Sequence, residues 1–154
     1  MQLVFALALA LLVAPCAVRA GDLPDPSMTP GLVDSALTKD RLCSRDFHTA
    51  SIRNVPSAVK AQAYEAYHLV PGESPCPCEI DHLVSLELGG SNDITNLWPQ
   101  SYITVPWNAH KKDALENHLH KLVCEDKVTL AQAQREIAVN WISSYVLRVG
   151  ELSE

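Results

Sequence analysis

The segment EIDHLVSLELGGSNDITNLWPQ, residues 79–100, constrains the fold more than any other part of the chain. Before its turn lie apolar positions that suit β-structure, namely Leu83, Val84, Leu86 and Leu88. The run Gly89-Gly90-Ser91-Asn92-Asp93 is a dense turn signal. We therefore expect two short strands joined by a loop.

Helical patterns surround this segment. We expect a short helix capped by Asp34, helices over about 57–69 and 107–123, and a final helix that begins at Thr129. Thr129 and Gln132 form the T-x-x-Q pattern of a capping box. The centre of the chain is then strand, turn, strand and helix, followed by a long supporting helix.

The first 20 residues match an export signal. Leu3 to Val13 is an unbroken apolar run that is shorter than the roughly 20 residues of a membrane-spanning helix. Val18-Arg19-Ala20 suits cleavage before Gly21. We expect a signal peptide at 1–20, an extended lead-in at 21–40 and one domain at 41–150. The mature protein would be periplasmic or secreted, with no membrane segment.

Export changes the reading of the cysteines. Cys43, Cys76, Cys78 and Cys124 remain in the mature chain, an even number in an oxidising compartment. Three pairings are open, and we favour Cys43–Cys124. Cys76-Pro77-Cys78 near His82 also matches part of a structural zinc site.

The net charge of −6 becomes more negative when Arg19 is removed. This argues against broad, charge-driven binding of phosphate backbones, which needs clustered Lys and Arg. A nucleic-acid substrate would require local positive charge or a bound cation.

Asp81 and His82 suit phosphodiester hydrolysis. A divalent cation neutralises charge on the scissile phosphate, and a histidine that titrates near neutrality activates water. Asp81 offers a hard oxygen ligand and His82 a base. Asn96 returns across the turn, where its amide could pin the backbone or the imidazole of the facing strand.

Together with PWNAHKKDALENHLHKLVC, residues 79–100 resemble the HNH endonuclease family, including small exported bacterial proteins with the same D-H-L-x-x-L-E-L-G-G and N-L-W-P-Q segments. The resemblance implies an α+β, mostly helical protein with a ββα-metal hairpin–helix core and additional N- and C-terminal helices. It implies catalysis by His82 as general base, oriented by Asn96. It also implies one divalent ion, Mg or Mn with Zn or Ni as alternatives, bound by Asp81.

The second metal ligand stays open. Asn108 has the best position near the start of the helix, and His110, Asp113 and Glu79 are alternatives. On a regular strand, Glu79 and Asp81 point to one face and His82 to the other, so a bulge is needed to bring His82 and Asp81 to one cation.

Lys111, Lys112 and Arg53 are candidate contacts for substrate phosphate. We therefore expect an exported, metal-dependent endonuclease that acts as a monomer, with DNA as the expected substrate. The alternative is a non-catalytic exported protein that binds a metal or a partner on the same scaffold.

Overall fold

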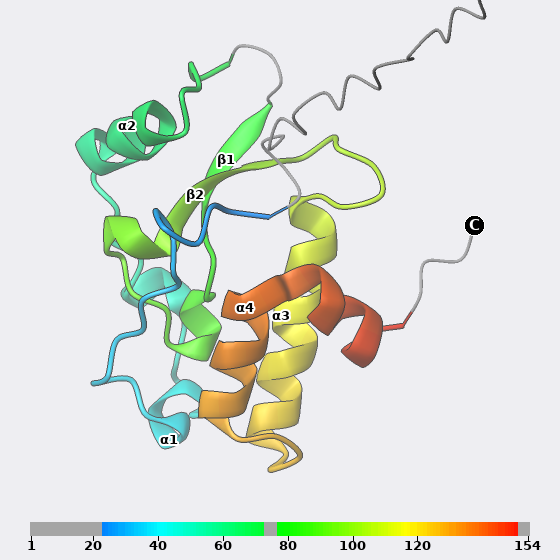
Figure 1. The fold of residues 1–154 in the computed structure, drawn as a ribbon. Helices are drawn as coiled ribbons and strands as arrows, with labels where there is room; N and C mark the ends of the chain where they lie inside the picture. The colour runs from blue at the N-terminus through cyan, green and yellow to red at the C-terminus, as the bar shows by residue number, and fades with distance from the viewer. Residues whose placement is uncertain (1–22, 73–76, 151–154) are drawn as a thin grey trace, which may run out of the picture.

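The computed structural model describes residues 23–72 and 77–150 (Figure 1). The expected signal peptide at 1–20 and Cys76 lie outside the described residues. The strands and helices, in chain order, are α1 Lys39–Leu42, α2 Ser57–Ala66, β1 Cys78–His82, β2 Leu97–Ser101, α3 Ala109–Cys124 and α4 Leu130–Arg148.

The two strands pair as an antiparallel hairpin. The register runs without interruption from Cys78 opposite Ser101 to His82 opposite Leu97. Two short strands joined by a loop are thus confirmed. The continuous register contains no bulge, so Asp81 and His82 alternate in direction at the end of β1.

The predicted strand positions from Leu83 to Leu88 were wrong. They lie after β1, in a loop and a short 3-10 helix, Leu86–Leu88. These side chains are buried because the loop folds inward rather than because it pairs in a sheet. A buried loop and a buried strand have the same apolar content, so the sequence pattern did not distinguish them.

The Gly-Gly pair fits this inward turn. Gly89 has a φ of 77°, a conformation that favours glycine. A Cβ placed on Gly90 would lie 1.7 Å from the Val84 carbonyl oxygen, so only glycine allows this approach. The turn therefore brings residue 90 against the backbone just beyond β1.

The last two helices pack against each other and carry the core (Figure 1). Asn108 caps α3 and Thr129 caps α4, each through a side-chain oxygen that accepts a backbone N–H three residues on. Fully buried apolar side chains from the two helices include Leu115, Leu119, Ile137 and Trp141.

Helix α4 bends at Asn140, which has non-helical φ and ψ of −165° and 94°. The Asn140 side chain accepts the Ser143 backbone N–H and so caps the second half of the helix. Our expectation of one uninterrupted helix missed this bend.

The described part of the lead-in packs on the hairpin rather than extending away from it. Thr29 is buried and donates to the Leu97 carbonyl oxygen, and Val33 forms a β-bridge with Gly90. The protein is α+β, but the expectation of a mostly helical chain was wrong, because turns and irregular segments link short elements throughout the first half. Among the described residues, no helix is long and apolar enough to cross a membrane.

Candidate functional site

Lys112 joins α3 to the end of β1. Its ammonium donates to Asp81 Oδ2 at 2.7 Å, to the His82 carbonyl oxygen at 2.7 Å, and to the Glu116 carboxylate. An ammonium has three N–H donors, so all are used. The Lys112 side chain is 0% exposed. The expectation that Lys112 contacts substrate phosphate therefore does not fit, because its charge is buried and already paired.

The single cation Lys112 faces two carboxylates, Asp81 and Glu116. Burial alone would lower the pKa of Lys112, but Asp81 and Glu116 raise it overall, so the ammonium stays protonated. Burial raises the pKa of Glu116, against the opposing effect of Lys112. This ion triad fixes the backbone and side chain of the Asp81-His82 dipeptide to α3.

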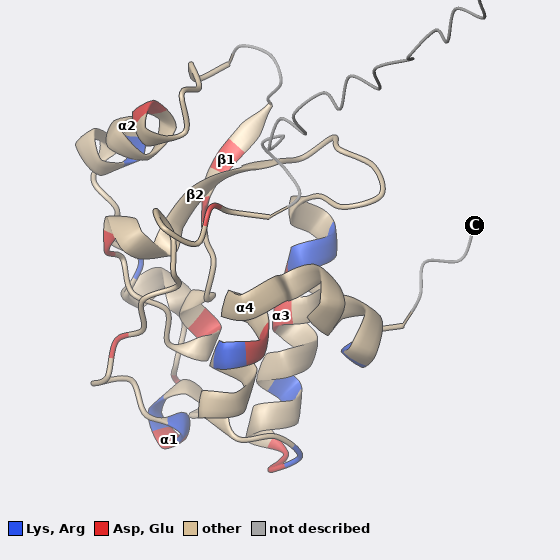
Figure 2. Ribbon diagram, in the orientation of Figure 1, with Lys and Arg blue, Asp and Glu red and all other residues tan. Residues whose placement is uncertain are grey.

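Asp81 also lies near two further carboxylates. Burial and the Asp81 charge raise the pKa of Asp113. Burial raises the pKa of Glu79, with further contributions from the charges of Asp81 and Asp113, while the Tyr102 hydroxyl donates to Glu79 at 2.6 Å and opposes this. Figure 2 shows acidic positions on β1 and both acidic and basic positions along α3.

The Asp81 carboxylate is only partly buried. The Asp81 side chain is 17% exposed, and Lys112 contacts one of its two oxygens. Among the described residues, Glu79, Asp81 and Asp113 do not form a closed group of three ligands. Mg²⁺ is commonly held by one or two carboxylates and keeps several waters, so it does not require such a closed group.

The other candidate residues on α3 make contacts of their own. The Asn108 side chain accepts from Lys111 N–H and donates to the Thr104 carbonyl oxygen, at 3.2 and 3.0 Å. The His110 ring lies against the Tyr102 ring, with 5.5 Å between centroids. The Lys111 ammonium lies 5.7 Å from the centre of the Tyr145 ring.

His82 is buried and held by a residue that the sequence did not point to. Its side chain contacts Asn92, with 3.1 Å between Nε2 and Oδ1, and the residue is 3% exposed. Burial lowers the pKa of His82, and the charges of Arg53 and Lys112 act in the same direction, while Asn92 and Asp81 oppose it. Burial therefore favours the neutral form of the imidazole.

Asn96 does not hydrogen-bond His82. Its side chain accepts from Val84 N–H and donates to the carbonyl oxygens of Val84 and Ser91, each at 2.9 Å. It therefore pins the backbone just beyond the Asp-His pair. The contact to the imidazole comes from Asn92, whose other partners lie near residue 53, so no local sequence signal identifies it.

Arg53 lines a polar pocket of about 240 Å³. The other lining residues are Thr49, Ser85, Leu86, Glu87, Asp113, Glu116 and Asn117. The charge of Arg53 acts on both His82 and Asp113, so this exposed guanidinium lies on the side of the site that carries both groups.

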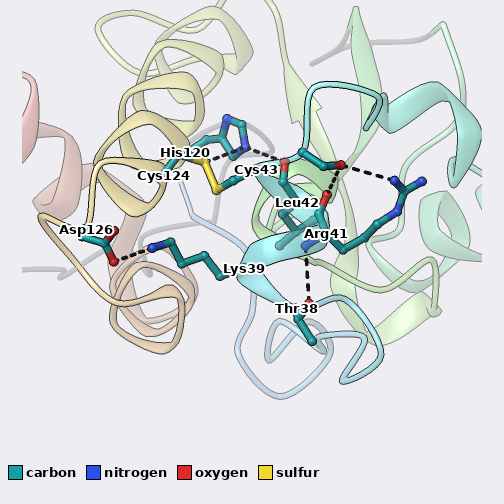
Figure 3. The surroundings of a disulfide bond; sticks show 9 residues. Thr38, Lys39, Arg41, Leu42, Cys43, His120, Cys124 and Asp126 are labelled. Carbon is teal, nitrogen blue, oxygen red and sulfur yellow. Dashed lines mark hydrogen bonds and ion pairs between the residues drawn. A yellow bond between two sulfur atoms is a disulfide. The ribbon is translucent and has the colours of Figure 1, made fainter.

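A second group of metal-ligating side chains lies at the far end of α3 (Figure 3). The ligand atoms of Cys43, His120 and Cys124 lie within 4.8 Å of one another and could hold a metal ion. The two sulfurs form the disulfide favoured from the sequence, and His120 Nε2 lies 3.5 Å from Cys124 Sγ. Metal binding needs thiolates, so the disulfide and a metal are alternatives here.

Cys78 is also disulfide-bonded. Its sulfur is therefore not a thiolate, so Cys78 does not support the structural zinc site considered at Cys76-Pro77-Cys78.

Comparison with protein-family models, with curated proteins and with solved structures finds no match to this chain.

Proposed function

We propose that this protein is an exported endonuclease that hydrolyses phosphodiester bonds, with DNA as the expected substrate, on an HNH-like ββα-metal core. The observation that carries the proposal is the imidazole of His82, held by the Asn92 side chain and next to Asp81 in the chain, at the end of a hairpin that is followed by a helix. A neutral imidazole is the protonation state that a general base requires.

Asp81 is the residue that would hold the divalent ion. Asp113 is the α3 donor with the better structural support, because its carboxyl group responds to the Asp81 charge and Asn108 serves as the helix cap. When bound, such an ion would neutralise charge on the scissile phosphate and on the leaving oxygen.

The chain's own residues supply the remaining steps. His82 accepts a proton from the attacking water. The ion triad of Lys112, Asp81 and Glu116 holds the Asp-His dipeptide in place. Arg53, exposed at the polar pocket, attracts a phosphate into surroundings that are otherwise acidic.

The test is plasmid cleavage by purified protein that begins at Gly21, with Mg²⁺ or Mn²⁺ and with EDTA. We expect nicking that needs the metal and that falls by about 100-fold or more in His82→Ala. His118→Ala, a partly buried histidine on α3 outside the proposed site, is the matched control and should cleave like the wild type. Equal cleavage by His82→Ala and the wild type, with both folded by circular dichroism, would end the proposal.

A second candidate is a non-catalytic exported binding protein on the same scaffold. It is favoured by the 3% exposure of His82, because a base needs access to water. This candidate predicts metal binding without cleavage and a His82 that resists diethylpyrocarbonate. Modification of His82 that is slowed by substrate DNA would instead support the nuclease.

A further inference from the structure

The Asn92 side chain can adopt only one orientation of its amide. Its Oδ1 accepts the backbone N–H of Asn54 at 3.1 Å, and its Nδ2 donates to the Ile52 carbonyl oxygen at 2.8 Å. If the amide were flipped, its NH₂ group would face the Asn54 N–H, and its oxygen would face the Ile52 carbonyl oxygen. Neither pair can form a hydrogen bond. The backbone at 52–54 therefore decides which Asn92 atom faces the site.

The atom that faces His82 is the oxygen. Asn92 Oδ1 carries no proton, so at 3.1 Å it can only accept, and His82 Nε2 must be the donor. A neutral imidazole has a single N–H. In the neutral ring the proton is therefore on Nε2, and Nδ1 keeps its lone pair.

We infer that Asn92 is a positioning residue that locks His82 in the Nε2–H tautomer and thereby makes Nδ1 the nitrogen that accepts the proton of the attacking water. The role of Nδ1 in accepting the proton rests on the proposed nuclease function. The tautomer of His82 does not depend on that function. The segment that anchors Asn92 also carries Arg53, so one set of hydrogen bonds places both the base and a phosphate-binding guanidinium.

The direct test is the tautomer of His82 in ¹⁵N-labelled protein that begins at Gly21. Two-bond ¹H–¹⁵N correlation spectra distinguish the tautomers, and His82 is assigned by the signals that disappear in His82→Gln. At a pH where the ring is neutral, we expect the proton on Nε2 in the wild type and a mixture of both tautomers in Asn92→Ala.

Two further variants separate the side chain from the fold. Asn92→Asp keeps an accepting oxygen but loses the N–H donor to the Ile52 carbonyl oxygen. At a pH where the ring is neutral, it should keep the proton on Nε2. Asn54→Ala removes only an exposed side chain and retains the backbone N–H, so its spectrum should match that of the wild type. A wild-type proton on Nδ1, or an Asn92→Ala spectrum identical to the wild type, overturns the tautomer lock. If Asn92→Ala does not fold, the spectra of the wild type and of Asn92→Asp still show which ring nitrogen of His82 carries the proton.

Kinetics tests the catalytic half. We expect Asn92→Ala to lower kcat by about tenfold or more while leaving KM unchanged, and Asn92→Asp to recover most of the loss. An unchanged kcat in Asn92→Ala contradicts a role for the lock in catalysis. Absence of cleavage by the wild type would sink the proposed function, and the spectra would still report the tautomer.

Discussion

At the scale of single residues, a buried lysine is the strongest constraint on the site. Lys112 is 0% exposed and uses its three donors on Asp81, Glu116 and the His82 backbone. Burying a charge is tolerable only when it is paired and hydrogen-bonded, as here. Lys112 therefore determines where Asp81 and His82 lie.

Lys112→Met should destabilise the fold by about 3–5 kcal/mol, because it leaves two partly buried carboxylates without their cation. Urea denaturation followed by tryptophan fluorescence measures this. Lys111→Met is the matched control and should cost about 1 kcal/mol or less, since it loses only a contact with the Tyr145 ring. Equal losses in the two variants would contradict a structural role for the triad.

Asn96→Ala should cost about 3 kcal/mol, because the side chain is fully buried and its removal leaves three backbone groups at Val84 and Ser91 unpaired. Asn117→Ala provides the comparison, since it removes one exposed hydrogen bond to the Asp113 carbonyl oxygen. Chemical denaturation of both variants gives the two values. A cost below about 1 kcal/mol for Asn96→Ala would mean that water replaces its contacts.

Sequence could locate only part of this site. Asp81 and His82 were found because they are adjacent and precede a turn, and Asn96 because it follows that turn. The direction of the Lys112 side chain depends on how α3 packs on β1, which local patterns do not encode. Asn92 was missed because its backbone partners lie about 40 positions earlier in the chain.

At the scale of elements, one predicted cap was confirmed and one was wrong. The short helix expected after Asp34 begins instead at Lys39, with Thr38 as its cap, and the Asp34 side chain accepts the Ala36 backbone N–H within a turn. Thr129 fixed the start of α4 as expected, because the capping hydrogen bond is local. The loop after β1 was read as a strand, because its burial comes from Asn96 and the close approach at Gly90, both tertiary. The bend at Asn140 was missed because a run of apolar positions continues across it.

An ion pair spans this bend. Arg148, in the second half of α4, donates to both carboxylate oxygens of Glu136, in the first half, at 2.9 and 2.6 Å. The hydrogen bond from Arg148 lowers the pKa of Glu136 below its ordinary value. The pair therefore holds the two halves of the helix at their angle.

The stability from this pair should depend on pH. Because the folded-state pKa of Glu136 is depressed, its contribution is present above the ordinary carboxylate pKa of about 4.5 and is lost as pH falls through the folded value. We expect Glu136→Gln to be less stable than the wild type by about 1 kcal/mol at pH 7. Urea titrations should show the two proteins converging between about pH 4.5 and pH 3.

Glu125→Gln is the comparison for this measurement, because Glu125 is paired with Lys127 on the exposed surface. Its difference from the wild type at pH 7 should be smaller. A gap between the wild type and Glu136→Gln that stays constant down to pH 3 would show that the carboxylate charge is not its source.

At the scale of the whole molecule, the Cys43–Cys124 disulfide ties the start of the domain to the end of α3 across 81 positions. Replacing both cysteines with alanine should lower the free energy of unfolding by about 4 kcal/mol, because the unfolded chain regains the entropy of a long loop. Thermal and urea unfolding of the double variant measure the loss. Reduction of the wild type also breaks the disulfide of Cys78, so it should lower stability by at least as much. Full stability of the double variant would contradict this account.

The same bond encloses a covalent ring. Arg53, His82, Asn92 and Asp113 all lie between its two cysteines, whereas α4 lies outside. A protease that cuts once inside the ring leaves a nicked molecule whose two pieces stay joined, visible as two bands only on a reducing gel. In surroundings rich in proteases, the groups of the proposed site can therefore remain together after a cleavage that would separate them in an uncrosslinked chain.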